Sequence, residues 1–542
     1  MSETQNPEHR PSLFETFRRG LNARIPGEEP VVPVRVEMGG HSWRRIERAA
    51  LLDTARRQVA DSVRRHLQAL GIPGRPAVEL QASLDTAEDL SLRVHGQPGR
   101  VPREQVTEIL HRLAGPDCWS LAELPAELIG TGIAGYCSGA VHRRPSMLLG
   151  DEQTGFYADI LGRTGPAGPA DPPGPGLGGA LAASWLREVL IPVLDAGVSI
   201  GDTGTVARLL ADGQFDAVPP SYIAERIINE LRLDAVHIRL SGPTLRWLTT
   251  QETVPDDVFA GIRERLYAES GALFPDFMFT EDPELPPRTV AFGLNSLVTL
   301  PVRLPDHDPV QAVAACLESE LRTHRGWFMC MSVVEERFKQ LRFACPDLVD
   351  AILDSYPMEW ITAVGRDLFR EQVPTQSLKT ILEHALDFGI VGDGTDAVRF
   401  NASAAITPKP AIDSYPDPRA VVSYLRQRSN EMLQESTLVG QLGTLFMLGP
   451  ELSELAAKPE AAAGSSGDPR GEIISAAVRH QLASSPDGLS LAVRSVPVRS
   501  LVRELLEPEF PLIPVVATQE FGVLQIGLLG DDASPETGNT VG

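Results

Sequence analysis

Residues 162–179 constrain the fold of this chain more than any other segment. They read GRTGPAGPADPPGPGLGG, and 12 of these 18 residues are glycine or proline. Proline lacks a backbone donor and glycine loses the most conformational freedom on folding, so the segment can form neither a helix nor an interior strand. We therefore predict a linker that divides the 542 residues into two parts.

The two parts differ in charge. The whole chain carries a net charge of −23, of which residues 1–180 contribute −2 and residues 181–542 contribute −21. Nucleic acids and anionic lipids attract cationic surfaces, so we expect no nucleic-acid partner for so acidic a chain. The hydrophobic fraction of 42% is that of ordinary globular domains, and the length predicts about three to five of them.

Three features predict a cytoplasmic protein. No stretch approaches the roughly 20 apolar residues that a membrane-spanning helix requires. The N-terminus, MSETQNPEHRP, is polar and lacks the apolar region of a secretory signal. The five cysteines are odd in number and form no C-x-x-C pair, which is typical of reduced thiols.

Hydrophobic spacing predicts a helix followed by two strands, and this order occurs twice. The first helix carries seven arginines opposite its apolar side, which we interpret as a solvated face rather than a docking surface, and Gly71 ends it. Such an order favours small α+β units with helices on one face of an antiparallel sheet. The helices are predicted at residues 42–70 and 258–266, and the strands at 77–84, 90–95, 274–280 and 288–295.

After residue 308 the pattern becomes mostly helical. The clearest helix is predicted over residues 375–388, with apolar residues at helical spacing from Leu378 and a stop at Gly389. A compact α/β subdomain is predicted at the C-terminus, from strands at 437–447, 489–494 and 512–517 and a helix at 498–506.

These patterns predict a multidomain α+β protein with a helical subdomain and a C-terminal α/β subdomain. Its expected parts are a flexible N-terminus (1–30), an N-terminal α+β domain (31–161), the linker (162–179), a helical segment (180–218), an α+β domain (219–307), a helical domain (308–395), a C-terminal α/β domain (396–528) with a loop at 456–470, and a disordered tail (529–542).

No motif nominates a catalytic, cofactor-binding or metal-ligating residue. The phosphate-binding pattern G-x-x-x-x-G-K-[ST] is absent. The nearest cysteine and histidine pairs, Cys137 with His142 and His324 with Cys330, lack zinc-type spacing. We therefore expect a protein that is not an enzyme and needs no cofactor or metal.

Three polar or glycine-rich segments receive structural interpretations instead. Residues 201–204 (GDTG) are interpreted as the start of a helix, and residues 306–308 (DHD) as turn and cap residues, because aspartate and threonine suit both roles. Residues 132–139 (GIAGYCSG) form no G-x-S-x-G elbow and are interpreted as a flexible loop.

The segment order has a known counterpart. Residues 274–295 (FPDFMFTEDPELPPRTVAFGLN) combine an apolar strand, an acidic turn, a Leu-Pro-Pro step and a second strand, and residues 371–383 follow the pattern E-x-V-x-x-x-x-L-x-T-I-L-E. Together with residues 317–389 and the terminal VPVRSLVRELLEPEFPLIPVVATQEF, they resemble the FHIPEP family, the export-gate proteins of flagellar and virulence type III secretion. The matching motif residues, interpreted as structural, are Glu371, Val373, Leu378, Thr380, Ile381, Leu382, Glu383 and Leu386.

The resemblance implies a function in protein secretion. Family members join a membrane domain to a cytosolic domain of several subdomains, which assembles as a ring and receives export substrates and chaperones. Residues 219–528 would be the cytosolic part, and the membrane domain is absent from this sequence. The resemblance thus implies a protein-binding platform that forms a homo-oligomer. Its expected partners are export substrates, chaperones or secretion components, and these partners would place it beside the inner membrane. The alternative is a soluble scaffold or adaptor repurposed for a non-secretory signalling or defence assembly.

A weaker likeness lies earlier in the chain. Residues 185–212 also resemble the family, and residues 31–95 mirror the helix-and-two-strand unit found later. This pattern predicts a degenerate tandem duplication, with an accidental likeness of helical patterns as the alternative.

Overall fold

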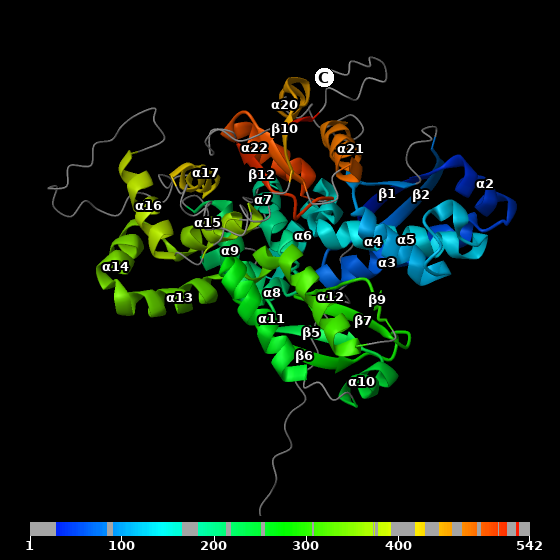
Figure 1. Ribbon diagram of the computed structural model, residues 1–542, viewed down its shortest axis with the longest axis horizontal. Coiled ribbons are helices and arrows are strands. Elements are labelled where there is room, and N and C mark those ends of the chain that lie inside the picture. Colours follow the sequence, from blue (N-terminus) through cyan, green and yellow to red (C-terminus); the bar gives the residue numbers. More distant parts are fainter. Residues whose placement is uncertain are drawn as a thin grey trace, which may run out of the picture.

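The computed structural model describes residues 29–83, 90–164, 183–212, 218–250, 255–305, 308–371, 373, 375, 378–391, 418–428, 444–457, 469–484, 489–507, 509–517 and 527–529. The predicted flexible N-terminus and most of the predicted linker, loop and tail lie outside these residues. The described part is a mixed helical and sheet protein of several units, as predicted (Figure 1). The prediction of antiparallel sheets in the small units is wrong, because each of these sheets contains one parallel strand pair.

The first module is built on a four-stranded sheet with the order β2-β1-β3-β4. Strand β1 buries alternate side chains, Val32, Val34, Val36 and Met38, against the helices that cover one face. Two helices connect β1 to β2, so β2 returns parallel to β1, whereas β3 and β4 are antiparallel. The elements are β1 (Val31–Met38), α2 (Gly40–Arg48), α3 (Leu52–Leu70), β2 (Arg75–Ala82), β3 (Leu90–Val94), β4 (Gln97–Gly99), α4 (Arg103–Ala114), α5 (Ala126–Arg143) and α6 (Asp151–Thr164).

The second module repeats this topology. Its sheet has the order β6-β5-β7-β8, with β5 and β6 parallel, β5 and β7 antiparallel, and two helices between β5 and β6. The turn after β3 and the turn after β7 each use a residue with φ of 50°, His95 and Asn295. The same strand order, pairing and turn are what a tandem duplication predicts. The elements are β5 (Ala235–Leu240), α10 (Gly242–Thr249), α11 (Pro255–Ser270), β6 (Asp276–Glu281), β7 (Thr289–Leu294), β8 (Leu297–Val298), β9 (Val302–Arg303) and α12 (Pro309–Thr323).

Two details of the first module differ from the prediction. The helix predicted over residues 42–70 is broken at Ala50, whose φ is 53°, into α2 and α3. Residues 132–139 are not a loop but lie inside α5, because their glycines allow close packing. An added Cβ at Gly132 would come within 2.9 Å of Leu121, and one at Gly135 within 3.0 Å of Ile109 of α4.

The two modules share one hydrophobic core. A continuous cluster of buried side chains runs from Val32 to Phe328 and includes the helices between the modules, α7 (Ala183–Asp195), α8 (Thr203–Asp212) and α9 (Pro220–Leu231). Asp202 caps α8 by accepting from the amide of Thr205 at 3.0 Å, as predicted for this segment. The predicted domains 31–161, 180–218 and 219–307 therefore pack as one body.

The helical domain has its own core and different limits from those predicted. Helix α12 packs in the shared core of the modules, so the helical domain starts near Met329 rather than at residue 308. Its last helix, assigned by the prediction to the C-terminal domain, buries Val421, Val422 and Leu425 in the helical core. The helices are α13 (Met331–Ala344), α14 (Pro346–Ser355), α15 (Met358–Arg370), α16 (Leu378–Val391) and α17 (Pro418–Arg428).

The predicted stop of α16 at Gly389 is wrong, since the helix continues to Val391.

The C-terminal domain is the predicted α/β unit. Its four strands are all parallel, in the order β12-β11-β10-β13, and Figure 1 shows this domain in orange and red beside the first module and the helical domain. The elements are β10 (Thr444–Leu448), α20 (Pro450–Ala457), α21 (Pro469–Ser484), β11 (Leu489–Val493), α22 (Val496–Leu506), β12 (Val515–Ala517) and β13 (Gly527–Leu529).

We expect Gly71→Ala to destabilise the module body by at least about 3 kcal/mol. Gly71 ends α3 with φ of 70°, and an added Cβ would meet the backbone of Gly201 in the segment that leads into α8. Gly96→Ala is the matched control, because Gly96 has φ of 78° but open space around it, so it should cost only about 1 kcal/mol. Urea denaturation measures both, and equal losses would contradict the close approach of the two segments.

Candidate functional site

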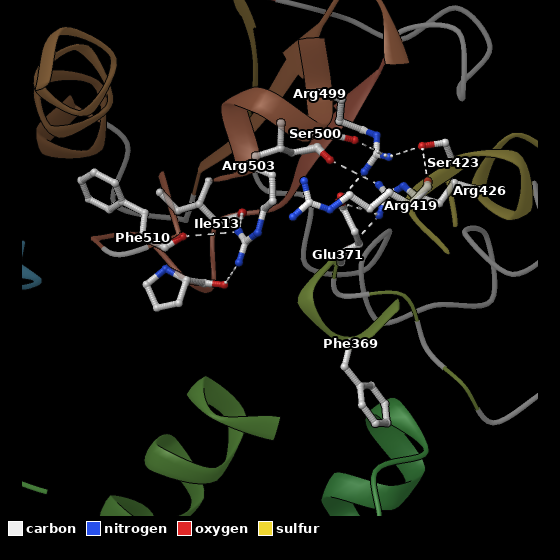
Figure 2. A network of polar contacts seen from close by, with 12 residues as sticks. Phe369, Glu371, Arg419, Ser423, Arg426, Arg499, Ser500, Arg503, Phe510 and Ile513 are labelled. Atoms are coloured by element: carbon white, nitrogen blue, oxygen red, sulfur yellow. Dashed lines mark hydrogen bonds and ion pairs between the residues drawn. The ribbon is translucent and has the colours of Figure 1, made fainter. Parts of the chain in front are cut away.

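A buried charge network joins the helical domain to the C-terminal domain. Its centre is the carboxylate of Glu371, which directly follows α15. Arg499 of α22 donates to Glu371 Oε2, and Arg426 of α17 lies 3.7 Å from the same oxygen. Both guanidinium groups are fully buried, whereas the Glu371 side chain is 12% exposed. Figure 2 shows Glu371 between the two arginines.

The two arginines also cross the junction in opposite directions. Arg426, from the helical domain, donates to the backbone oxygen of Val515 in β12 at 3.2 Å and to that of Glu371 at 2.7 Å. Arg499, from the C-terminal domain, donates to the hydroxyl of Ser423 in α17 at 3.3 Å (Figure 2). Each domain therefore supplies hydrogen bonds that the other domain needs.

Arg503 holds the turn before β12. Its guanidinium donates to the backbone oxygens of Pro511 at 2.5 Å and Ile513 at 2.9 Å. Burial lowers the pKa of Arg503, although Glu507 and Glu371 act in the opposite direction. The side chain thus satisfies carbonyl groups that no strand pairing reaches.

A second ion pair reinforces the junction. Arg370 donates to both carboxylate oxygens of Glu507, at 3.2 and 3.0 Å. Burial alone would raise the pKa of Glu507, but Arg370 and Arg503 outweigh it and the pKa is lowered. Beside them, burial raises the pKa of Asp367 to about 6, even though Arg370 lies 3.8 Å away.

The opposite side of the helical domain is fixed to the module body. Arg366 of α15 donates to both carboxylate oxygens of Glu225 in α9, at 2.9 and 2.7 Å. It also donates to the backbone oxygen of Gly326 at 2.8 Å. Because both side chains are largely buried, this bidentate pair fixes the orientation of α15 on α9.

The motif residues fall into two groups. Glu371 contacts the C-terminal domain through Arg499. Val373, Ile381 and Leu382 are buried in the helical core, and Leu378 and Leu386 pack against it. Thr380 is half-buried, and Glu383 is exposed, 3.7 Å from Lys379.

A cleft lies between the first module and the C-terminal domain. It encloses about 380 Å³, and its lining includes Leu92 and Ile109 from the module and Trp119, which is 64% exposed. Arg479 and Glu509 line it from the C-terminal domain, and Arg479 donates to Glu509 at 2.6 Å. The cleft therefore combines an apolar wall with charged groups.

Arg100 bridges the two sides of this cleft. It follows β4, is only 8% exposed, and donates to the backbone oxygen of Gly471 at 2.5 Å and to the hydroxyl of Ser475 in α21. Its guanidinium also lies 3.9 Å from Glu509. The sequence did not indicate this contact, because more than 370 residues separate its partners.

No protein-family model and no curated protein matches the chain. Solved structures that resemble it are cytosolic domains of type III secretion export-gate proteins, the family that the sequence motifs indicate. Within the described ranges, no helix is both long and apolar enough to span a bilayer.

Three of these structures illustrate the likeness. The CdsV protein of Chlamydia pneumoniae is 18% identical, with a match that covers 55% of this chain and 97% of that one at a TM-score of 0.43. The MxiA protein of Shigella flexneri is 14% identical, with 55% and 98% covered and a TM-score of 0.42. The nonameric EscV cytosolic domain from the type III secretion system is 14% identical, with 55% and 97% covered and a TM-score of 0.41. At TM-scores below 0.5, no residue role carries over from them.

We expect Glu371→Ala to destabilise the protein by about 3–5 kcal/mol, because it removes the carboxylate shared by two buried guanidinium groups. Glu383→Ala is the matched control, since it removes a motif glutamate that is exposed, and it should cost less than about 0.5 kcal/mol. Chemical denaturation followed by circular dichroism measures both. A loss for Glu371→Ala no larger than that for Glu383→Ala would show that the junction does not depend on this charge.

We expect Asp367 to make the folded state less stable as pH rises from about 4 to about 6. Its pKa is near 3.8 when unfolded and about 6 when folded, so the folded state binds more protons in this window. Asp367→Asn should remove that decline, and the difference between the two proteins isolates this group from the histidines. The free energy of unfolding, measured across the window, tests this. Parallel pH profiles for the two proteins would contradict the assignment.

Proposed function

We propose that this chain is a non-enzymatic protein-binding platform in type III protein secretion or in an assembly derived from it. The observation that carries the proposal is the sequence motif from Glu371 to Leu386, which resembles the FHIPEP pattern and lies in a helical domain between two other domains. Glu371, which belongs to this motif, links the helical domain to the C-terminal domain. The motif thus helps to hold several domains in a fixed arrangement, as a binding platform requires.

Protein partners and oligomer formation are part of this proposal. Among the similar structures, CdsV is found in a complex with CdsO, and the EscV cytosolic domain is a nonamer. We extend both properties to this chain as hypotheses: a ring of copies in the cytoplasm, with secretion components, chaperones or export substrates as its partners.

The cleft beside Arg100 is the proposed docking site. Its apolar side chains, including the exposed Trp119, would take an apolar side chain of a partner segment. Arg103, which is exposed at the start of α4, would attract a carboxylate on the same segment. We therefore expect a partner segment that is apolar and acidic.

The charged groups of the cleft favour binding over catalysis. Arg100, Arg479 and Glu509 are engaged with one another and with α21, which is typical of a domain contact. A general acid or base instead needs to face its substrate. This arrangement supports a non-enzymatic function.

We expect Trp119→Ala and Arg103→Glu to weaken partner binding, Trp119→Ala by at least about tenfold, because exposed aromatic residues in clefts often dominate binding energy. Phe343→Ala is the matched control, since Phe343 is 98% exposed on α13 and does not line the cleft. The wild-type chain and each variant are used for affinity purification from the native cell, followed by quantitative mass spectrometry.

The two parts of the proposal can fail separately. If no secreted protein, chaperone or secretion component is enriched with the wild-type chain, the role in secretion is wrong and the adaptor alternative is favoured. If such partners are enriched equally by the wild-type chain and Trp119→Ala, the platform function stands and the cleft is not the docking site.

A further inference from the structure

Two buried histidines meet where the two modules touch. His142 lies at the end of α5, and His324 directly follows α12. Each is followed by an arginine and a short 3₁₀ helix, η2 (Pro145–Leu148) and η3 (Arg325–Phe328), so the two histidines occupy similar positions at the ends of long helices. Their ring centres are 4.9 Å apart and their planes are inclined by 84°.

A carboxylate completes a cluster with these rings. Glu320 lies one helical turn before His324 on α12, and its Oε2 is 3.6 Å from His324 Nε2. One potential ligand atom from each of His142, Glu320 and His324 lies within 4.8 Å of the other two. All three side chains thus converge on one small region.

Neither ring nitrogen of His142 has a hydrogen-bond partner within the described part of the chain, and the same holds for His324 Nε2. The two residues are only 2% and 5% exposed. Buried polar groups without hydrogen-bond partners destabilise the folded state. Because the unpartnered nitrogens of both rings lie in the same small region, they indicate a ligand that is not part of the chain.

Two neutral rings and a carboxylate offer lone pairs to a cation, although the charge of Arg143 acts on all three groups. Burial lowers the pKa of His142 to about 3 and that of His324 well below its ordinary value, so both rings are neutral at neutral pH and keep a free lone pair. Burial also raises the pKa of Glu320, although Arg143 acts against it. A nearby divalent cation would stabilise the ionised carboxylate.

We propose that His142, Glu320 and His324 bind one divalent transition-metal ion of the zinc class and that this ion fastens the two modules together. Two imidazoles and one carboxylate form a donor set typical of zinc, whereas calcium and magnesium prefer oxygen ligands alone. At zinc–nitrogen distances of about 2.0–2.1 Å, two imidazoles on one tetrahedral ion have ring centres about 5 Å apart, close to the observed spacing. A fourth position remains for water.

This site has no local sequence signature, because its ligands come from both modules. Glu320 and His324 are four residues apart on α12, but His142 lies far away in the sequence. The fold of each module, together with their shared core, brings the ligands together.

The test uses untagged, full-length protein freed of metal with a chelator. Titration with zinc chloride, followed by calorimetry and by elemental analysis after gel filtration, should give one ion per chain. Cobalt(II), used as a spectroscopic probe, should develop the absorption of a tetrahedral site. Zinc should also raise the melting temperature of the metal-free protein.

Variants identify the ligands. Glu320→Gln keeps the size of the side chain and removes the charged ligand, and it should weaken zinc binding by at least about tenfold, as should His142→Phe. His41→Ala, at an exposed histidine of α2, is the control and should bind zinc as the wild type does. If His142→Phe does not fold, Glu320→Gln decides alone.

The proposal is overturned if the wild-type protein takes up less than one ion per chain at saturating zinc, or if Glu320→Gln binds zinc with unchanged affinity. Both outcomes are independent of the proposed role in secretion, because the assay contains no partner protein.

Discussion

The carboxylate of Glu371 is the interaction on which the arrangement of the domains depends. Two fully buried guanidinium groups, from Arg426 and Arg499, share it, and they belong to different domains. Removing a guanidinium group from water is costly unless an anion and hydrogen-bond acceptors replace the water. The helical and C-terminal domains supply these acceptors to each other, so neither surface is complete alone. The Arg366–Glu225 pair fixes the helical domain to the modules in the same way.

The two modules depend on apolar packing instead. Each is a mixed sheet with a two-helix crossover, and both bury their side chains in the same core with α7, α8 and α9 between them. The two modules thus pack against each other within one chain, much as two subunits of a dimer do. The chain therefore combines a body held mainly by the hydrophobic effect with three domain junctions that contain buried charge.

Local sequence patterns predicted the local parts of this structure. The end of α3 at Gly71 and the Asp202 cap of α8 both depend on neighbouring residues, and the structure confirms them. The break at Ala50 was missed because apolar spacing continues across it. The helix over residues 132–139 was missed because its glycines serve contacts with Leu121 and with Ile109 of α4, which are invisible in the local pattern.

The candidate site was harder to predict than the fold. The resemblance indicated Glu371, but its partners Arg426 and Arg499 lie 55 and 128 residues further along the chain. Arginine is common in this sequence, so no single one stands out. The domain limits near residues 308 and 396 were wrong for a related reason, because α12 and α17 were assigned by their order in the chain, whereas the core that buries each helix decides its domain.

The reciprocal contacts at this junction also bear on the order in which the protein is made. Arg426 binds a backbone oxygen of β12 that lies 89 residues later, and the sheet that contains β12 is ordered around β10, which pairs with β13 near the end of the chain. Domains that emerge first usually fold first during synthesis. Here the helical domain leaves the ribosome before its partners in the C-terminal domain have been made. These partners are Arg499, which binds the Glu371 carboxylate, and the backbone oxygen of Val515, which accepts from Arg426. The final packing of the helical domain is therefore a late event, completed after β12 has been translated.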